Sequence, residues 1–131
     1  MASPADLTEV PLFDDLDEGE RIELARWFEE RSVGPGVRLV GEGTVGYSFF
    51  VLVGGAAEVV SGDETLGQLV PGDFFGEVAI LGDGRRSATV TTTEPSKVLA
   101  MFGTEFRRLQ AAQPAIAESI LRTMKTRVAA D

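Results

Sequence analysis

The residues best suited to bind a ligand lie in the segment 74–90, whose sequence is FFGEVAILGDGRRSATV. Gly76 and Glu77 open an apolar stretch that is too short for a full helix, so we expect one helical turn beginning near Gly76. The first N–H groups of such a turn have no partner within it and carry partial positive charge, which suits a phosphate. Arg86 lies nine residues after Glu77, and its fixed fork of donors matches phosphate oxygens. Glu77 can only accept hydrogen bonds, so a sugar hydroxyl is a natural donor to it.

A purely structural role is the alternative for these residues. Glu77 and Arg86 can form an exposed ion pair worth under about 1 kcal/mol, with Gly76 as a turn residue. Catalysis is disfavoured because the chain has no His and no Cys, which excludes imidazole bases, thiolate nucleophiles and the usual zinc and iron sites. No Ser-x-x-Lys pair or obvious carboxylate dyad takes their place. We therefore expect a binding module without metal or cofactor, and not an enzyme.

The candidate segment interrupts a β-rich region that covers residues 33–102. Short runs of β-forming residues alternate there with glycine-containing turns every eight to ten residues or so, which is typical of an antiparallel sandwich or barrel. The runs include VRLV, SFFVLV, AAEVV, TLGQLV, SATVTT and SKVLAMF. In the second run, positions 49–53 are all apolar, so both faces of that strand are expected to be covered. The pattern predicts a small jelly roll.

Helical patterns precede the β-rich region. Asp17 is an N-cap acid with Glu20 three positions on, and apolar residues follow at helical spacing, which predicts a helix over about 17–30. The short apolar segment 10–13 is expected to pack a turn against the domain, with a loosely ordered tail as the alternative.

Two helices are expected after the β-rich region. Thr104 can cap a short helix to about Ala112, and Pro114 opens a second helix to about Ala130. The last helix carries a narrow apolar seam made of Ala117, Leu121, Met124 and Val128. The seam either packs on the barrel or forms a homodimer through the C-terminal helix, and the sequence leaves both open.

Together these patterns predict a single domain of 131 residues. The expected fold class is mainly β with flanking helices: a double-stranded β-helix jelly-roll barrel with an N-terminal helix and two C-terminal helices. The predicted parts are a helical N-terminus at 7–30, a β-roll at 31–102 and C-terminal helices at 104–130.

The segment 74–90 resembles the phosphate-binding cassette of cyclic nucleotide-binding domains, which occur in catabolite activators, potassium channels and kinase regulatory subunits. In that cassette F-G-E recurs with a small residue two places after the Glu and R-x-A-T nine residues from it. The matching residues here are Phe75, Gly76, Glu77, Ala79, Arg86, Ala88 and Thr89. The upstream segment 42–52, EGTVGYSFFVL, followed by Gly55 and Glu58, is similar to a second motif of the family. The resemblance covers roughly residues 10–130 and implies a jelly roll that binds a cyclic nucleotide.

The resemblance also implies a role for individual cassette residues. Glu77 and the Gly76 backbone would hold the ribose 2′-hydroxyl, and Arg86 would hold the exocyclic phosphate oxygens. The backbone N–H groups of Ala79 and Ser87 would contact the same phosphate. The predicted ligand-binding residues are Phe75, Gly76, Glu77, Val78, Ala79, Arg86, Ser87 and Ala88. Arg85 is the rival for the phosphate, but the register to Ala88 and Thr89 favours Arg86.

The sequence says less about which base the nucleotide carries and which residue covers it. A hydroxyl at Ser87 leaves both cAMP and cGMP open, and we favour cAMP because a serine here also serves the phosphate alone. Family members commonly cover the purine with the C-terminal helix or a residue just beyond it. The candidates for such a base lid are Ile120, Thr123, Met124 and Arg127.

Charge and composition limit the partners. The net charge is −9; residues 1–65 carry 14 acids against 4 bases, and residues 66–131 carry 7 acids against 8 bases. Direct nucleic-acid binding is disfavoured because phosphates demand a basic face, and an anion site is expected in the second half. No apolar run is long enough for a membrane span and the N-terminus lacks a signal-peptide pattern, which favours a cytoplasmic location.

Two functions remain in view. In the first, a regulatory sensor binds a cyclic nucleotide and transmits binding through its C-terminal helices to an unknown effector protein. In the second, a ligand-free jelly roll acts as a scaffold through its last helix and its acidic first half.

Overall fold

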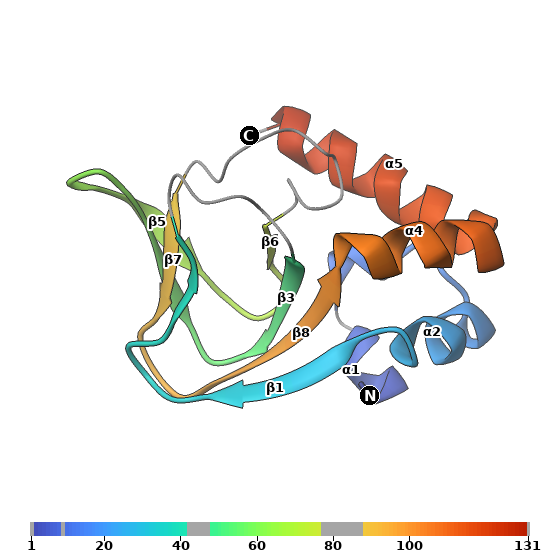
Figure 1. Cartoon of the computed structure of the whole chain (residues 1–131), viewed down its shortest axis with the longest axis horizontal. Coiled ribbons are helices and arrows are strands. Elements are labelled where there is room, and N and C mark those ends of the chain that lie inside the picture. Colours follow the sequence, from blue (N-terminus) through green and yellow to red (C-terminus); the bar gives the residue numbers. More distant parts are fainter. Residues whose placement is uncertain (1, 9, 42–47, 77–87, 131) are drawn as a thin grey trace.

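The computed structural model describes residues 2–8, 10–41, 48–76 and 88–130, with side chains up to residue 126 (Figure 1). The helices are α1 (Pro4–Leu7), the 3₁₀ turn η1 (Pro11–Phe13), α2 (Glu18–Ala25), α4 (Gly103–Ala112) and α5 (Pro114–Ala130). The strands are β1 (Glu29–Val33), β2 (Arg38–Val40), β3 (Ser48–Gly54), β4 (Ala57–Ser61), β5 (Glu64–Leu69), β6 (Phe74–Phe75), β7 (Thr89–Thr92) and β8 (Ser96–Phe102). Within these described ranges no helix is both long enough and apolar enough to cross a membrane.

Within the described residues the strands form two antiparallel sheets of four strands each, in the orders β1-β8-β3-β6 and β2-β7-β4-β5. Strands that are far apart in sequence pair side by side, as in a jelly roll. Figure 1 shows the helices gathered beside the first sheet, while the β4–β5 hairpin extends away from them at the other end. The predicted fold class, mainly β with flanking helices, is confirmed.

Strand β3 separates two apolar clusters, because its successive side chains point to opposite faces of the sheet. Phe49 and Val51 are buried against the helices, in a set we call the helix-side cluster. Phe50 and Leu52 are buried between the two sheets, in a set we call the roll cluster. The prediction that both faces of this strand are covered is confirmed.

The helix-side cluster joins the chain's two ends. The rings of Phe13 and Phe28 lie 5.8 Å apart and those of Phe28 and Phe49 lie 5.9 Å apart, so one aromatic row runs from η1 to β3. On α5, Ala117 and Met124 are buried in the same cluster and Leu121 packs against it. These three seam residues therefore pack inside the chain. The apolar segment 10–13 also packs here, as predicted, because Leu12 and Phe13 are buried.

The N-terminal helix is shorter than predicted. It ends at Ala25, and residues 29–33 form β1 instead of a last helical turn. The reason is tertiary: β1 pairs with β8 in a regular antiparallel register from Glu29 opposite Ala100 to Val33 opposite Ser96. The expected N-cap at Asp17 is confirmed, and its side chain accepts a hydrogen bond from the Glu20 N–H at 2.8 Å.

The N-terminal helical region also begins earlier than the predicted residue 7. Ser3 and Asp6 form a capping box around α1, a single turn that the sequence patterns did not predict.

The C-terminal helices lie where the sequence places them, with one difference in capping. Helix α4 begins at Gly103, and its N-cap is Phe102 without a side-chain hydrogen bond, so the capping role predicted for Thr104 is wrong. Phe102 is the last residue of β8, and the chain turns directly from strand into helix. The end of α4 at Ala112 and the start of α5 at Pro114 agree with the prediction.

Candidate functional site

The candidate cassette leaves the first sheet at β6. Phe75 is buried, pairs with Phe50 on β3, and stacks on its ring with centroids 5.2 Å apart at 16°. Gly76 follows with φ at +76°, in the left-handed region that favours glycine. The first two residues of the F-G-E motif are therefore held by strand pairing, by an aromatic stack and by a backbone conformation suited to glycine.

The same segment enters the second sheet at β7. Ala88 is half-buried and directly precedes β7, an inner strand of its sheet that pairs with both β2 and β4. In this register Thr89 lies opposite Val60, and Val90 lies opposite both Val59 and Val40. The two ends of the cassette thus belong to different sheets, and the segment between them connects the halves of the roll.

Five predicted ligand-binding residues, Glu77, Val78, Ala79, Arg86 and Ser87, lie outside the described residues. The helical turn expected near Gly76 falls on the same segment. Residues 42–47 of the second motif, which include Thr44 and Tyr47, are outside the described part as well.

The base-lid candidates lie on α5 but differ in burial. Ile120 and Met124 are buried in the helix-side cluster, so a lid role for either requires α5 to leave its place in that core. Thr123 is half-buried. Arg127 belongs to the helix, and its side chain lies outside the described residues.

Gly55, from the second motif, has a role in the fold. Its φ is +89°, and a Cβ there would lie 2.6 Å from the carbonyl oxygen of Pro95 and closer still to the Ser96 hydroxyl. That hydroxyl donates to the Glu94 carbonyl oxygen at 2.8 Å. A glycine at this position lets the turn that joins β3 of one sheet to β4 of the other pack against the turn before β8. This residue belongs to the second motif, and its role in the structure is backbone packing.

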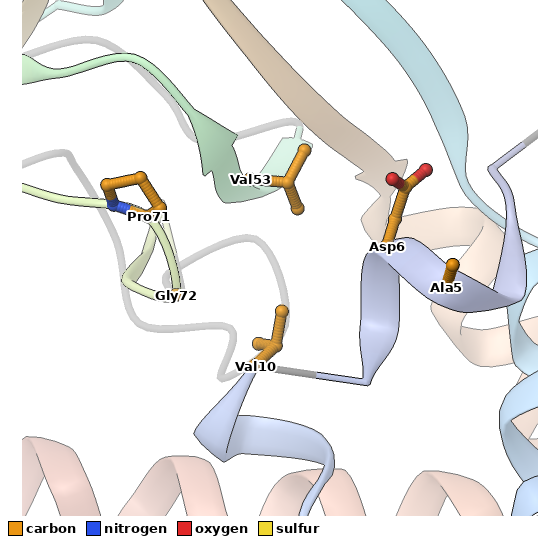
Figure 2. Close-up of a pocket in the computed structure, with 6 residues that line it drawn as sticks. All are labelled: Ala5, Asp6, Val10, Val53, Pro71 and Gly72. Atoms are coloured by element: carbon orange, nitrogen blue, oxygen red, sulfur yellow. The ribbon is translucent and has the colours of Figure 1, made fainter.

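A cavity of about 160 Å³ lies just upstream of the cassette (Figure 2). It is lined by Ala5, Asp6, Val10, Val53, Pro71 and Gly72, so α1 forms one wall and the β5–β6 turn forms the other. Its volume is below the roughly 300–1,000 Å³ of typical small-molecule sites. Among the described residues that line the cavity, only Asp6 is ionisable, and a carboxylate repels a phosphate. The cavity is therefore not suited to the phosphate of a nucleotide.

Asp6 is instead engaged in an ionic contact. The Lys97 ammonium on β8 lies 3.0 Å from the Asp6 carboxylate and 3.0 Å from that of Glu30 on β1. The hydrogen bonds to Asp6 and then to Glu30 raise the pKa of Lys97 above its ordinary value, because they favour the charged ammonium. This contact ties α1 to the first sheet.

Comparison with known proteins identifies the family. A family model described as a cyclic nucleotide-binding domain matches residues 30–113, which is more than half of the chain. The chain belongs to this family. The match begins in β1, ends at the start of the loop between α4 and α5, and includes the cassette and both sheets.

Individual relatives agree with the family. The chain is 38% identical over 105 residues to a cAMP-dependent protein kinase regulatory subunit of Colletotrichum orbiculare, covering 79% of this chain and 27% of that protein. Among solved structures, the N-terminal domain of a transcriptional regulator from Streptomyces coelicolor superposes with a TM-score of 0.82 at 26% identity, covering 94% of this chain and 91% of that one. A structure titled cAMP-bound PfPKA-R (141–441) gives a TM-score of 0.75 at 26% identity, covering 94% and 45% of the two chains. The chain spans about a fifth to a third of the length of the curated relatives it matches.

Proposed function

We propose that this domain binds a cyclic nucleotide, with cAMP as the preferred ligand, and acts as a regulatory module. The observation that carries the proposal is the coincidence of the F-G-E and R-x-A-T motifs with a family match that covers them. The preference for cAMP is supported by the names of a cAMP-dependent kinase subunit and a cAMP-bound structure among the relatives. The family is one of binding domains, and we propose no catalytic step.

In this proposal Arg86 neutralises the cyclic phosphate with its guanidinium, aided by the N–H groups of Ala79 and Ser87. Glu77 and the Gly76 backbone hold the ribose 2′-hydroxyl. The buried Phe75 supports this arrangement, because its stack on Phe50 fixes the strand that enters the cassette.

Regulation requires that the nucleotide bind two arrangements of the helices with different affinity, since a ligand cannot otherwise shift their populations. Helix α5 is suited to this role, since it packs on η1 and α4 and carries the half-buried Thr123. We propose that Thr123 and Arg127 are the α5 residues from which a base contact can form without dismantling the core. We propose that an effector protein responds to this change.

The deciding experiment is calorimetric titration of the protein with cAMP. Arg86→Ala leaves the phosphate without its guanidinium, and we expect a loss of roughly 2–5 kcal/mol, or about 30-fold to several thousand-fold in affinity. Arg85→Ala is the matched control, because it removes the same charge one residue away and should change affinity by less than about threefold.

Binding has an independent readout in stability. At a cAMP concentration 100 times its dissociation constant, the wild-type protein gains about 2.7 kcal/mol against unfolding. If the protein shows no heat of binding and no thermal shift with either cAMP or cGMP, the proposal is overturned and a ligand-free scaffold is favoured. Equal losses in Arg85→Ala and Arg86→Ala would remove Arg86 from its proposed role.

A further inference from the structure

A second concave surface lies between α1 and α2, at the end of the molecule away from the β4–β5 hairpin (Figure 1). This α1–α2 groove encloses about 480 Å³ and is lined by Pro4, Ala5, Thr8, Glu18, Arg21 and Ile22. Its volume falls within the roughly 300–1,000 Å³ of typical ligand sites, unlike the smaller cavity beside β6. Nothing in the proposed cyclic-nucleotide function uses it.

The groove has an apolar wall that the fold leaves uncovered. On α2, Leu24 and Ala25 are buried in the helix-side cluster, whereas Ile22 is 49% exposed. Pro4 and Ala5 of α1 are exposed as well and line the same groove. An aliphatic side chain from outside can therefore bury apolar surface here without disturbing the core.

The lining of the groove contains one carboxylate, that of Glu18, and one guanidinium, that of Arg21, and the segment that carries both is acidic. Residues 14–23 contain six carboxylates and one guanidinium. Glu18 lines the groove, Asp14 and Asp15 lie just before α2, and none of these three has an ion-pair partner in the described part of the chain. The surface therefore favours a positively charged occupant.

Arg21 offers a different kind of contact at the same place. Its Nη2 atom donates to the Phe13 carbonyl oxygen at 3.3 Å, and no carboxylate in the described part of the chain forms an ion pair with it. A guanidinium that already contacts a main-chain carbonyl has further donors for the carbonyl oxygens of an added peptide segment. The groove thus combines an apolar contact, acidic charge and a main-chain donor.

The sign of the charge selects the class of occupant. A second copy of this chain carries the same net charge of −9 and is repelled, as are nucleic acid and anionic lipid. We propose that the α1–α2 groove docks a basic segment of a partner protein. That segment inserts an aliphatic side chain beside Ile22 and places lysine or arginine side chains against the carboxylates of residues 14–23.

The probe is an acetylated and amidated tetrapeptide that contains one leucine and three lysines, titrated into the isotope-labelled full chain and followed by amide chemical shifts. We expect the shifts to concentrate in residues 5–8 and 18–22. Ile22→Ser should weaken the apparent affinity by about fivefold, because it removes the aliphatic contact. Leu66→Ser is the matched control: Leu66 is 55% exposed on β5, far from the groove, and its loss should leave the affinity unchanged.

A second pair of variants distinguishes the effect of a carboxylate in the groove from the effect of the net charge of the protein on peptide binding. Glu18→Lys should weaken binding more than Glu64→Lys, which makes the same charge change on β5. Binding should also fall in about 1 M salt, where the screening length is about 3 Å. Equal effects of the two lysine variants, shifts outside the groove, or equal binding of a peptide with serine in place of leucine would each overturn the proposal. These outcomes are independent of cAMP binding, which Arg86→Ala tests.

Discussion

The two apolar clusters on either side of β3 differ in how completely they are closed. In the helix-side cluster Phe13 and Phe49 are fully buried and Phe28 is 2% exposed. In the roll cluster Leu52 and Val98 are fully buried, but Phe50, Phe75 and Val40 keep 4%, 6% and 7% of their surface exposed. The more open residues include the stacked pair Phe50 and Phe75, which lies where the cassette begins.

This difference indicates that the two clusters have different roles, one in stability and the other also in ligand binding. The helix-side cluster unites both ends of the sequence around one face of the first sheet, and it holds the continuous aromatic row of Phe13, Phe28 and Phe49. The roll cluster is smaller among the described residues and is adjacent to the proposed ligand segment. We therefore expect mutations on the first side to act on stability and mutations on the second side to act on binding as well.

The largest expected effect is a difference in stability loss between alanine variants of two adjacent phenylalanines on β3. Phe49→Ala should lower the free energy of unfolding by about 3–5 kcal/mol, because it leaves a closed cavity among aromatic rings. Phe50→Ala should cost at least about 1 kcal/mol less, because its site is more open and the residual cavity is smaller. Urea denaturation of both variants measures the difference, and an equal or larger cost for Phe50→Ala would contradict the comparison.

A smaller effect is expected at β6, where Phe74 packs against the helix-side cluster and Phe75 belongs to the roll cluster. Phe74→Leu and Phe75→Leu should each lower stability by about 1 kcal/mol. Only Phe75→Leu should also weaken cAMP binding, by about tenfold, since it loosens the strand that enters the cassette. Calorimetric titration of both variants with cAMP tests this. Similar affinities for the two variants would contradict a specific role of Phe75 in ligand binding.

The smallest effect concerns the ionic contact of Lys97, at the edge of the helix-side cluster. Hydrogen bonds to Asp6 and Glu30 raise the pKa of Lys97, so the folded state favours the charged form. The stabilisation is fully present below the unfolded-state pKa and is lost as pH rises through the folded-state pKa. Lys97→Met should therefore cost at most about 1 kcal/mol at neutral pH and less as the solution becomes strongly alkaline.

Unfolding of wild type and Lys97→Met at about pH 8 and about pH 11 measures this dependence, since lysine titrates near pH 10.4. Arg108→Met, which removes an exposed pair with Glu105, is the control. Its difference from wild type should not change over this interval, because arginine stays charged. A Lys97 difference that grows with pH would contradict the assigned direction of the pKa shift.

Much of the roll could be predicted from local signals. The all-apolar run at 49–53 predicted a strand covered on both faces, and the glycine-containing turns predicted where the later strands are separated. The predictions from sequence were wrong where pairing with a distant segment of the chain determines the local conformation. The sequence EERSV of β1 has no alternating apolar pattern, and Trp27 with Phe28 extended the helical pattern beyond its true end.

The candidate site divides in the same way. The resemblance to the family's cassette motif predicted the site and favoured Arg86 over Arg85, and these assignments remain proposals to be tested by titration. The burial of Met124 could not be predicted from the seam on α5, because an apolar helix face does not specify what covers it, and Ile120 is buried although it lies outside that seam.

The sequence by itself determined the alternation of strands and turns, the start of the last helix at Pro114 and the motifs that place the chain in its family. Those features depend on neighbouring residues and on backbone preferences. Only the tertiary structure decided that residues 29–33 form a strand, that one sheet separates two cores, and that α5 packs on the N-terminal turn η1. Each of these depends on residues far apart in the chain, whose pairing and burial outweigh local propensity.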